Sequence, residues 1–276
     1  MSHACRLLGI TRQAVYQREK RLALRKLELA PVKQMVMEIR RFMPRLGTRK
    51  LYHLLRARFE EQGVKLGRDR FFDYLRDQHL LVQPLKRYTK TTQSKHWMKK
   101  YPNLLKARDL RRAEQVFVSD ITYVETNEGV HYLSLVTDAY SRKIMGYEVS
   151  DNLRAESIVK ALRRAARKRQ SRQELIHHSD RGLQYCSAIY QRELRRHEMT
   201  PSMTDGYDCY QNALAERVNG ILKQEFLLNK CQDLKELRSL VRESVDIYNR
   251  LRPHLSLNMK TPEEVHRKAT SGVEVA

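Results

Sequence analysis

The sequence has few cysteines and lacks any long apolar run. The four cysteines lie far apart and form no C-x-x-C pair: Cys5, Cys186, Cys209 and Cys231. Zinc ribbons and disulfide frameworks need closer or more numerous cysteines, so we expect isolated reduced thiols. There is no run of about 18 apolar residues, and the N-terminal MSHACRLLGI lacks the hydrophobic stretch of a secretory signal. These absences exclude a membrane-spanning helix and predict a soluble, cytoplasmic protein.

Acidic residues are scarce in the first two-fifths of the chain. Residues 1–112 hold 29 Lys and Arg against 9 Asp and Glu, an excess of 20 positive charges. Residues 113–276 hold 25 against 23, so almost all of the net charge of +22 lies in the N-terminal part. Such asymmetry is typical of nucleic-acid binding, because every neutralised phosphate releases condensed counterions. A basic surface that serves solubility, or a ribosome-associated protein, is the alternative.

The N-terminal part contains two helix-turn-helix patterns. In ACRLLGITRQAVYQREKRL, Gly9 separates two helical stretches and Thr11 is a plausible N-cap for the second. The second helix of such a unit enters the major groove, so we expect base contacts from its first residues, Arg12, Gln13 and Tyr16. A glycine turn also occurs in many helical hairpins that do not bind DNA. A basic helical stretch continues over residues 20–43.

The second pattern follows at residue 48. Thr48 is a candidate cap for RKLYHLLRARFEEQG, and Gly63 and Gly67 interrupt the chain before RDRFFDYLRDQHLL. The apolar residues at helical spacing in both segments are expected to form a core. The neighbouring cations are suited to phosphates, and we expect DNA contacts from Arg49, Lys50, Arg68 and Arg70.

The pattern changes near residue 114. QVFVSDITYV and VHYLSLVTDAY are rich in β-branched and aromatic residues and flank a TNEG turn, and RKIMGYEVS makes a third strand. Helices and short strands then alternate, which predicts an α/β fold, a mixed sheet flanked by helices behind an all-α region. One helix, over residues 154–169, belongs to a segment with seven cations between residues 160 and 172. We expect four parts: a DNA-binding region 1–83, a basic linker 84–112, a catalytic core 113–232 and a helical extension 233–276.

Three acids of the second part are candidates for chemistry. Asp120 lies inside an apolar strand, Asp180 follows the strand LIHHS, and Glu216 lies mid-helix in NALAERVNG. Taken alone, each of these acids has an ordinary explanation, as a solvated surface acid or as the N-cap of a helix. Together, three carboxylates favour a hard cation such as Mg²⁺ or Mn²⁺, and two such ions are the usual device for in-line phosphoryl transfer. A basic module beside this site implies the cutting or joining of DNA.

Five ordered blocks resemble the integrase-core transposases of bacterial insertion sequences, most closely the second-frame protein of the IS-three family. They are VSDITYV, LSLVTDAYSRKIMGY, HSDRGLQY, NALAERVNGILKQEF and YNRLRPHLSLNMKTPEEV. The similarity covers nearly the whole chain. It implies an RNase H-like fold and an Asp-Asp-Glu triad of metal-binding catalytic carboxylates. The triad carries over to Asp120, Asp180 and Glu216, with the family's 35 residues between the last two.

Further residues match the family pattern or depart from it. The family's basic residue seven positions after the glutamate corresponds to Lys223, which we expect on the same helix face and at the DNA phosphate. Asn212 is expected on that face as well, supporting the glutamate, contacting DNA or serving a structural role. Asp138 is a rival ligand that we assign to a turn, while Asp205 and Asp208 suggest a mobile loop near the substrate. Phe117 stands where the family often has tryptophan.

The resemblance implies a reaction and a set of partners. Water would cut one strand at an element end, and the freed 3′-hydroxyl would attack a second phosphodiester, by way of a circular intermediate. Expected partners are double-stranded DNA, namely terminal repeats and target, other copies of the chain on that DNA, and a first-frame protein joined by frameshift fusion. In a bacterium the protein would associate with the nucleoid.

Three alternatives remain. A retroviral-type integrase would need a zinc module that His3 and Cys5 do not supply, and an RNase H-type nuclease would not need two helix-turn-helix units. An inactive or domesticated DNA-binding regulator is disfavoured by the intact triad and Lys223.

His177 and His178 are poor zinc ligands, because neighbours in a strand point to opposite faces. We expect both to be strand-end residues, one of them able to face DNA, and a sharp backbone turn at Gly182.

Overall fold

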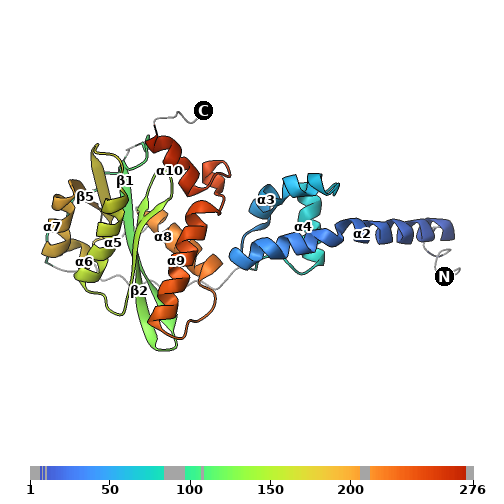
Figure 1. The fold of residues 1–276 in the computed structure, drawn as a ribbon, viewed down its shortest axis with the longest axis horizontal. Helices are drawn as coiled ribbons and strands as arrows, with labels where there is room; N and C mark the ends of the chain where they lie inside the picture. Colours follow the sequence, from blue (N-terminus) through green and yellow to red (C-terminus); the bar gives the residue numbers. More distant parts are fainter. Residues whose placement is uncertain are drawn as a thin grey trace. The chain divides into compact units, whose positions relative to one another are not determined.

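The structure, a computed structural model, describes residues 7, 9, 11–83, 97–106, 109–205 and 212–271. The chain divides into two compact units, Met1–Gln83 and Pro84–Ala276, and each is considered by itself (Figure 1). Within the described residues, no helix has the length and apolar character needed to cross a membrane.

The N-terminal unit begins with a long helix, α2 (Arg12–Phe42). Thr11 caps it as predicted, because its Oγ1 accepts a hydrogen bond of 3.1 Å from the Ala14 N–H. Its buried residues all lie in the C-terminal half, at Val32, Met35 and Val36. The preceding helix of the predicted first helix-turn-helix unit falls almost wholly outside the described residues.

Two shorter helices, α3 (Thr48–Glu61) and α4 (Arg68–Asp77), complete this unit. The predicted cap at Thr48 is wrong: the helix already includes this buried residue, and Gly47 occupies the cap position without a side-chain bond. The apolar faces form the expected core, with Phe59 packed edge-on to Phe71 at 5.6 Å between ring centroids.

The second unit contains a sheet of five strands in the order β3-β2-β1-β4-β5. β1 is antiparallel to β2, and β2 to β3, whereas β4 runs parallel to β1 and β5 parallel to β4. The sequence therefore predicted correctly both the three-strand meander and the mixed character of the sheet. The strands are β1 (Val116–Thr126), β2 (Gly129–Asp138), β3 (Ile144–Ser150), β4 (Leu175–Ser179) and β5 (Met199–Met203).

Helices cover both faces of this sheet (Figure 1). One face packs against α5 (Ala155–Lys168), α6 (Leu183–Cys186) and α7 (Ala188–Arg196), in a core centred on Phe117. The other lies under α8 (Ala213–Ile221) and α9 (Leu234–Arg250), with Ala215 of α8 against β1 and β4. α8 continues into the π-helix η2 (Leu222–Phe226). After α9, the predicted proline-containing break holds the 3₁₀ turn η3 (Leu255–Leu257), and α10 (Pro262–Thr270) follows.

The described part of the predicted basic linker belongs to the second unit. Leu104, Leu105 and Leu110 pack against the core on the α8 side, and Met98 and Tyr101 against the core on the α5 side. The Leu104 N–H also donates a hydrogen bond of 2.9 Å to Ser202 Oγ. The apolar side chains of this segment thus pack on the core between the cations, and its predicted path along DNA stays a prediction.

Candidate active site

Two aspartates occupy matching positions on neighbouring strands. In the parallel pairing of β1 with β4, Val118 lies beside His178. Asp120 and Asp180 each follow two residues later, on strands about 4.8 Å apart. Both are partly buried. The sheet thus places two carboxylates side by side at the carboxyl end of its central parallel pair.

Helix α8 is tied to this part of β1 by two asparagines. Nδ2 of Asn212 donates a hydrogen bond of 3.1 Å to the Ser119 carbonyl, and Nδ2 of Asn219 donates one of 2.8 Å to Oδ2 of Asp120. Glu216 lies between the two asparagines, exposed and in the first turn of the helix rather than at its middle. Asn219 was not identified from the sequence, although residues three apart are neighbours on a helix surface and Asn219 follows Glu216 by three.

The three carboxylates influence one another electrostatically. Burial of the carboxyl is the largest cause that raises the pKa of Asp120 to about 7, although the residue as a whole is only partly buried. The negative charge of Asp180 raises it further, and that of Glu216 makes a smaller contribution in the same direction. The hydrogen bond from Asn219 opposes this rise, because it stabilises the charged form.

Gly182 supports the second aspartate. Its N–H donates a hydrogen bond of 3.0 Å to Oδ1 of Asp180. Its φ of −62° is one that any residue adopts, so the predicted need for a glycine-specific turn is wrong. Space is the physical reason for glycine, because an added Cβ would lie 3.0 Å from the same carboxylate oxygen.

The carboxylates do not form a ready-made metal centre. Within the described ranges, no group of three or more His, Cys, Asp or Glu side chains is arranged to hold a metal ion. Glu216 is the outlying member of the predicted triad, being exposed while both aspartates are partly buried.

Known proteins are similar in sequence to most of this chain. Two family models, both described as an integrase core domain, match residues 111–209 and 197–262. The transposase InsF for insertion sequence IS3A from Escherichia coli is 31% identical over 272 residues, which are 96% of this chain and 93% of that protein. The insertion element IS600 uncharacterized 31 kDa protein of Shigella sonnei is 35% identical over 228 residues, or 81% and 84% of the two chains. The chain belongs to the IS3 (IS-three) family of insertion-sequence transposases.

The fold of this transposase is that of integrase catalytic cores. A chain of the simian T-cell lymphotropic virus intasome in complex with the PP2A regulatory subunit B56 gamma superposes with a TM-score of 0.50 and 15% identity, covering 84% of this chain and 74% of that one. The likeness confirms the predicted RNase H-like architecture. The family makes the transposase an enzyme of the polynucleotidyl transferase type.

Lys223 and Asn212 of the transposase both contact β1 close to Asp120. Lys223 belongs to the π-helix, where the turn is wider, and its Nζ lies 3.4 Å from Oγ1 of Thr122, two residues beyond Asp120 on β1. Burial lowers the pKa of Lys223, while the charge of Glu125 opposes this. Asn212 is the N-cap residue of α8 and is buried, and its predicted support of Glu216 or contact with DNA stays a prediction.

The paired histidines are core residues of the transposase, and neither faces DNA. Nε2 of His177 lies 2.8 Å from Ser119 Oγ and 2.9 Å from the Tyr190 hydroxyl. Nδ1 of His178 lies 2.9 Å from Ser202 Oγ. Burial lowers the pKa of His177 to about 3. A neutral ring with its proton on Nδ1 has one lone pair on Nε2, which accepts a hydrogen bond from one of the two hydroxyls at a time.

The other acids and the cysteines have ordinary roles. Asp138 is buried and accepts hydrogen bonds of 2.9 Å from the N–H groups of Glu114 and Ser141, which confirms its assignment to a turn. Asp205 forms an ion pair of 2.7 Å with Lys106, whereas Asp208 lies outside the described residues. Cys186 and Cys231 are buried free thiols, and Cys5 and Cys209 are not described.

The predicted DNA contacts of the N-terminal unit stay predictions. Lys50 is half-buried, and Arg68 forms an ion pair of 2.8 Å with Asp69. The remaining side chains are exposed, as contact with DNA requires: Arg12, Gln13, Tyr16, Arg49 and Arg70.

Proposed function

We propose that this transposase cuts and joins DNA strands with Asp120, Asp180 and Glu216 as its catalytic carboxylates. The observation that carries the proposal is the matched position of the two aspartates on adjacent parallel strands, with the Glu216 helix bonded to the first of them. In this proposal, three acids from distant parts of the sequence serve a single catalytic site.

The donor set suits a divalent metal ion. Its oxygen donors are those that Mg²⁺ and Mn²⁺ prefer, and the raised pKa of Asp120 reflects negative charges that a cation would neutralise. We propose that the three carboxylates hold two such ions, which requires exposed Glu216 to turn toward the aspartates. When bound, the ions would favour attack by an oxygen nucleophile and stabilise the leaving oxygen of the phosphodiester.

Residues around the carboxylates orient them and the DNA. The Asn219 amide fixes Asp120, and the Gly182 N–H fixes Asp180. Lys223 places a positive charge beside Thr122, on the same side of β1 as Asp120, where it can meet a phosphate of the scissile strand. The lowered pKa reflects the cost of burying this ammonium, which a phosphate would offset.

The remaining partners follow from the charge distribution and from the reaction. The N-terminal unit, with its large positive excess, would bind the terminal repeats, and the carboxylates would act on these ends and on target DNA. Two ends must be held together, so we propose an oligomer on DNA, with a first-frame protein joined by frameshift fusion as an additional reader. We place the protein in the bacterial cytoplasm at the nucleoid. A DNA-binding regulator without catalysis is not favoured by the family.

Metal-dependent strand joining tests this function. The full chain would be incubated with duplexes that carry the repeats flanking its coding sequence, and the cleaved and joined strands would be separated on denaturing gels. We expect both products with Mg²⁺ or Mn²⁺ and neither after chelation with EDTA, while binding of the ends persists. Equal yields of joined strands with and without EDTA would contradict the role of the metal.

A further inference from the structure

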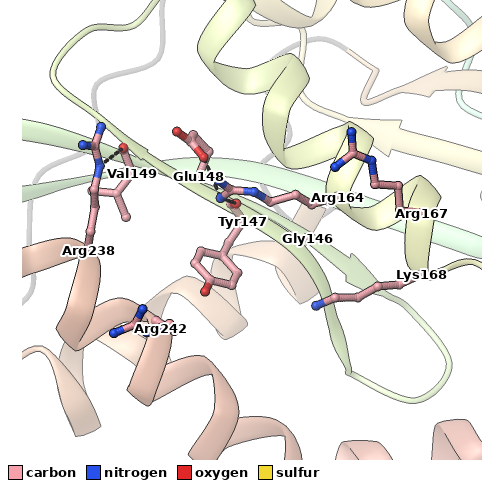
Figure 2. A pocket seen from close by; sticks show the side chains of 9 residues that line it. All are labelled: Gly146, Tyr147, Glu148, Val149, Arg164, Arg167, Lys168, Arg238 and Arg242. Atoms are coloured by element: carbon pink, nitrogen blue, oxygen red, sulfur yellow. Dashed lines mark hydrogen bonds and ion pairs between the residues drawn. The ribbon is translucent and has the colours of Figure 1, made fainter.

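A basic cavity of about 370 Å³ lies at the outer edge of the sheet, which we call the edge cavity. Residues 146–149 of β3 form its floor, and β3 is the terminal strand in the sheet order. Helices α5 and α9 flank it on two sides, with β3 between them (Figure 2). Five cationic side chains line the edge cavity: Arg164, Arg167, Lys168, Arg238 and Arg242.

The positive charge of the edge cavity is largely uncompensated. Glu148 is the only carboxylate among the lining residues, and it is bound to Arg164 in an ion pair of 2.6 Å. Although the Lys168 side chain is exposed, desolvation lowers the pKa of its ammonium, and the positive charge of Lys143 lowers it further against an opposing effect of Glu263. The charge of Arg164, which lines the cavity, also lowers the pKa of Lys168, so these two cations repel one another, and an anion bound between them would relieve this repulsion.

Two of the guanidinium groups are held in place by the floor of the cavity. Nε of Arg238 donates a hydrogen bond of 3.2 Å to the Val149 carbonyl, and Nη1 of Arg164 donates one of 2.6 Å to the Tyr147 carbonyl. In the described part of the chain, Arg167 makes no hydrogen bond or ion pair. The cavity thus combines fixed guanidinium groups with a free one, an arrangement that suits the several oxygens of a phosphate group.

The surroundings point to a nucleic-acid strand rather than a small ligand or a second copy. Five of the nine lining residues are cationic, so the cavity favours an anionic ligand. Residues 113–276 are nearly neutral, yet seven of their 25 cations lie between residues 160 and 172. A symmetric contact between two copies would place the same cations against each other, which is unfavourable. Duplex DNA offers closely spaced phosphates and is already the material on which a transposase acts.

The edge cavity also lies level with the proposed catalytic residues. Asp120 pairs with Leu135 on β2, and Leu135 pairs with Tyr147 on β3. The cavity floor is therefore two strands from Asp120 in the same row, or about 10 Å across the sheet. A phosphate in the cavity would belong to DNA that passes close to the reacting strand.

We propose that the edge cavity is a second DNA-backbone site of the transposase, at which Arg167, Lys168 and Arg242 bind phosphodiester groups of duplex DNA outside the three carboxylates. The inference rests on the proposed function for its purpose, but this binding requires neither a metal ion nor the triad. It assigns a role to the cluster of cations in α5 that the catalytic site leaves unused.

The test is the salt dependence of DNA binding by the full chain. Fluorescence anisotropy with a random-sequence duplex in EDTA would compare the wild type with the triple variant Arg167→Gln, Lys168→Gln and Arg242→Gln. A matched control triple, Arg192→Gln, Lys235→Gln and Lys268→Gln, removes three exposed cations of α7, α9 and α10 that do not line the cavity. We expect the cavity triple to lose about tenfold in affinity at low salt and its slope of log affinity against log salt to fall by about 2–3, with the control close to wild type.

A variant with lysine in place of arginine distinguishes an effect of lost charge from an effect of disturbed folding. Arg167→Lys with Arg242→Lys keeps the charge and should retain the wild-type slope. Equal affinities and slopes for the cavity triple and the control triple would overturn the proposal. So would a cavity triple that loses stabilisation by inorganic phosphate in thermal unfolding, or changes its oligomeric state in sedimentation, while its duplex affinity is unchanged. The assay contains no metal, so failure of strand joining would not affect its result.

Discussion

The side-chain amide of Asn219 donates a hydrogen bond of 2.8 Å to Oδ2 of Asp120 and so joins α8 to β1 at the proposed catalytic site. Asn219 is 4% exposed, and the bond favours the charged form of the aspartate. The helix that carries Glu216 is thereby fixed against the strand that carries Asp120. Asn219 is a positioning residue in this account, since it acts on the carboxylate and not on DNA.

Replacing Asn219 by alanine should therefore weaken metal-dependent activity. We expect Asn219→Ala to raise the Mg²⁺ concentration for half-maximal strand joining by about 10–100-fold, as is typical when a partner of a metal ligand is lost. The measurement is a Mg²⁺ titration of strand joining, with circular dichroism as a check on folding. A lower unfolding temperature with an unchanged Mg²⁺ requirement would indicate a structural role alone.

The space beside Asp180 gives a second prediction. A methyl group at Gly182 would lie 3.0 Å from Oδ1 of Asp180, so Gly182→Ala should displace the carboxylate. We expect a loss of about tenfold in the rate of strand joining, since small misplacement of a catalytic group is costly, and little change in the unfolding temperature. Single-turnover joining kinetics check this, and wild-type kinetics would show that the aspartate accommodates the methyl group.

Two glycines of the second unit should respond in opposite ways to alanine. A Cβ at Gly146 would lie 2.1 Å from the Ala161 carbonyl oxygen, because β3 packs directly against the backbone of α5. Gly146→Ala should lower the free energy of unfolding by about 1–3 kcal/mol or more. Gly220, in α8, has no atom within 4 Å of an added Cβ, so Gly220→Ala should raise it by about 0.5–1 kcal/mol. Urea unfolding of both variants measures the two signs.

The buried His177 predicts loss of stability in acid. Its pKa is about 3 in the fold against 6.5 ordinarily, so the unfolded chain takes up this proton first as the pH falls. The free energy of unfolding should decrease below about pH 6.5 by up to about 1.4 kcal/mol per pH unit, until the pH approaches 3. His177→Gln should show a shallower slope by one proton. His53→Gln, at an exposed histidine, should keep the wild-type slope in urea titrations across this range.

The sequence was sufficient for the strands and for the positions of the acids. β-branched residues mark β1 and β2, and the TNEG turn sets their register, so Asp120 could be placed inside the first strand and Asp180 directly after the strand LIHHS. The bond from Asn219 could not be predicted, because it depends on how α8 crosses β1. The change to a π-helix at Leu222, one residue before Lys223, could not be predicted either, because helical spacing does not reveal it.

Two further features of the structure depend on tertiary packing and cannot be predicted from local composition. Leu104, Leu105 and Leu110 lie among cations, and the basic composition concealed their use as core residues. The edge cavity combines cations of α5 with cations of α9. These two helices are about seventy residues apart in the sequence, so no local motif predicts the cavity. Both features depend on contacts between distant segments.

The most direct test of the central claim is strand joining by the triad variants. Asp120→Asn, Asp180→Asn and Glu216→Gln each remove one negative charge with little change in shape, and Glu243→Gln does the same at an exposed position of α9. We predict loss of joining in Mg²⁺ by about a thousandfold or more for the three triad variants, with binding of the element ends intact, and wild-type joining for Glu243→Gln. A triad variant that joins ends at the wild-type rate would contradict the assignment of that carboxylate.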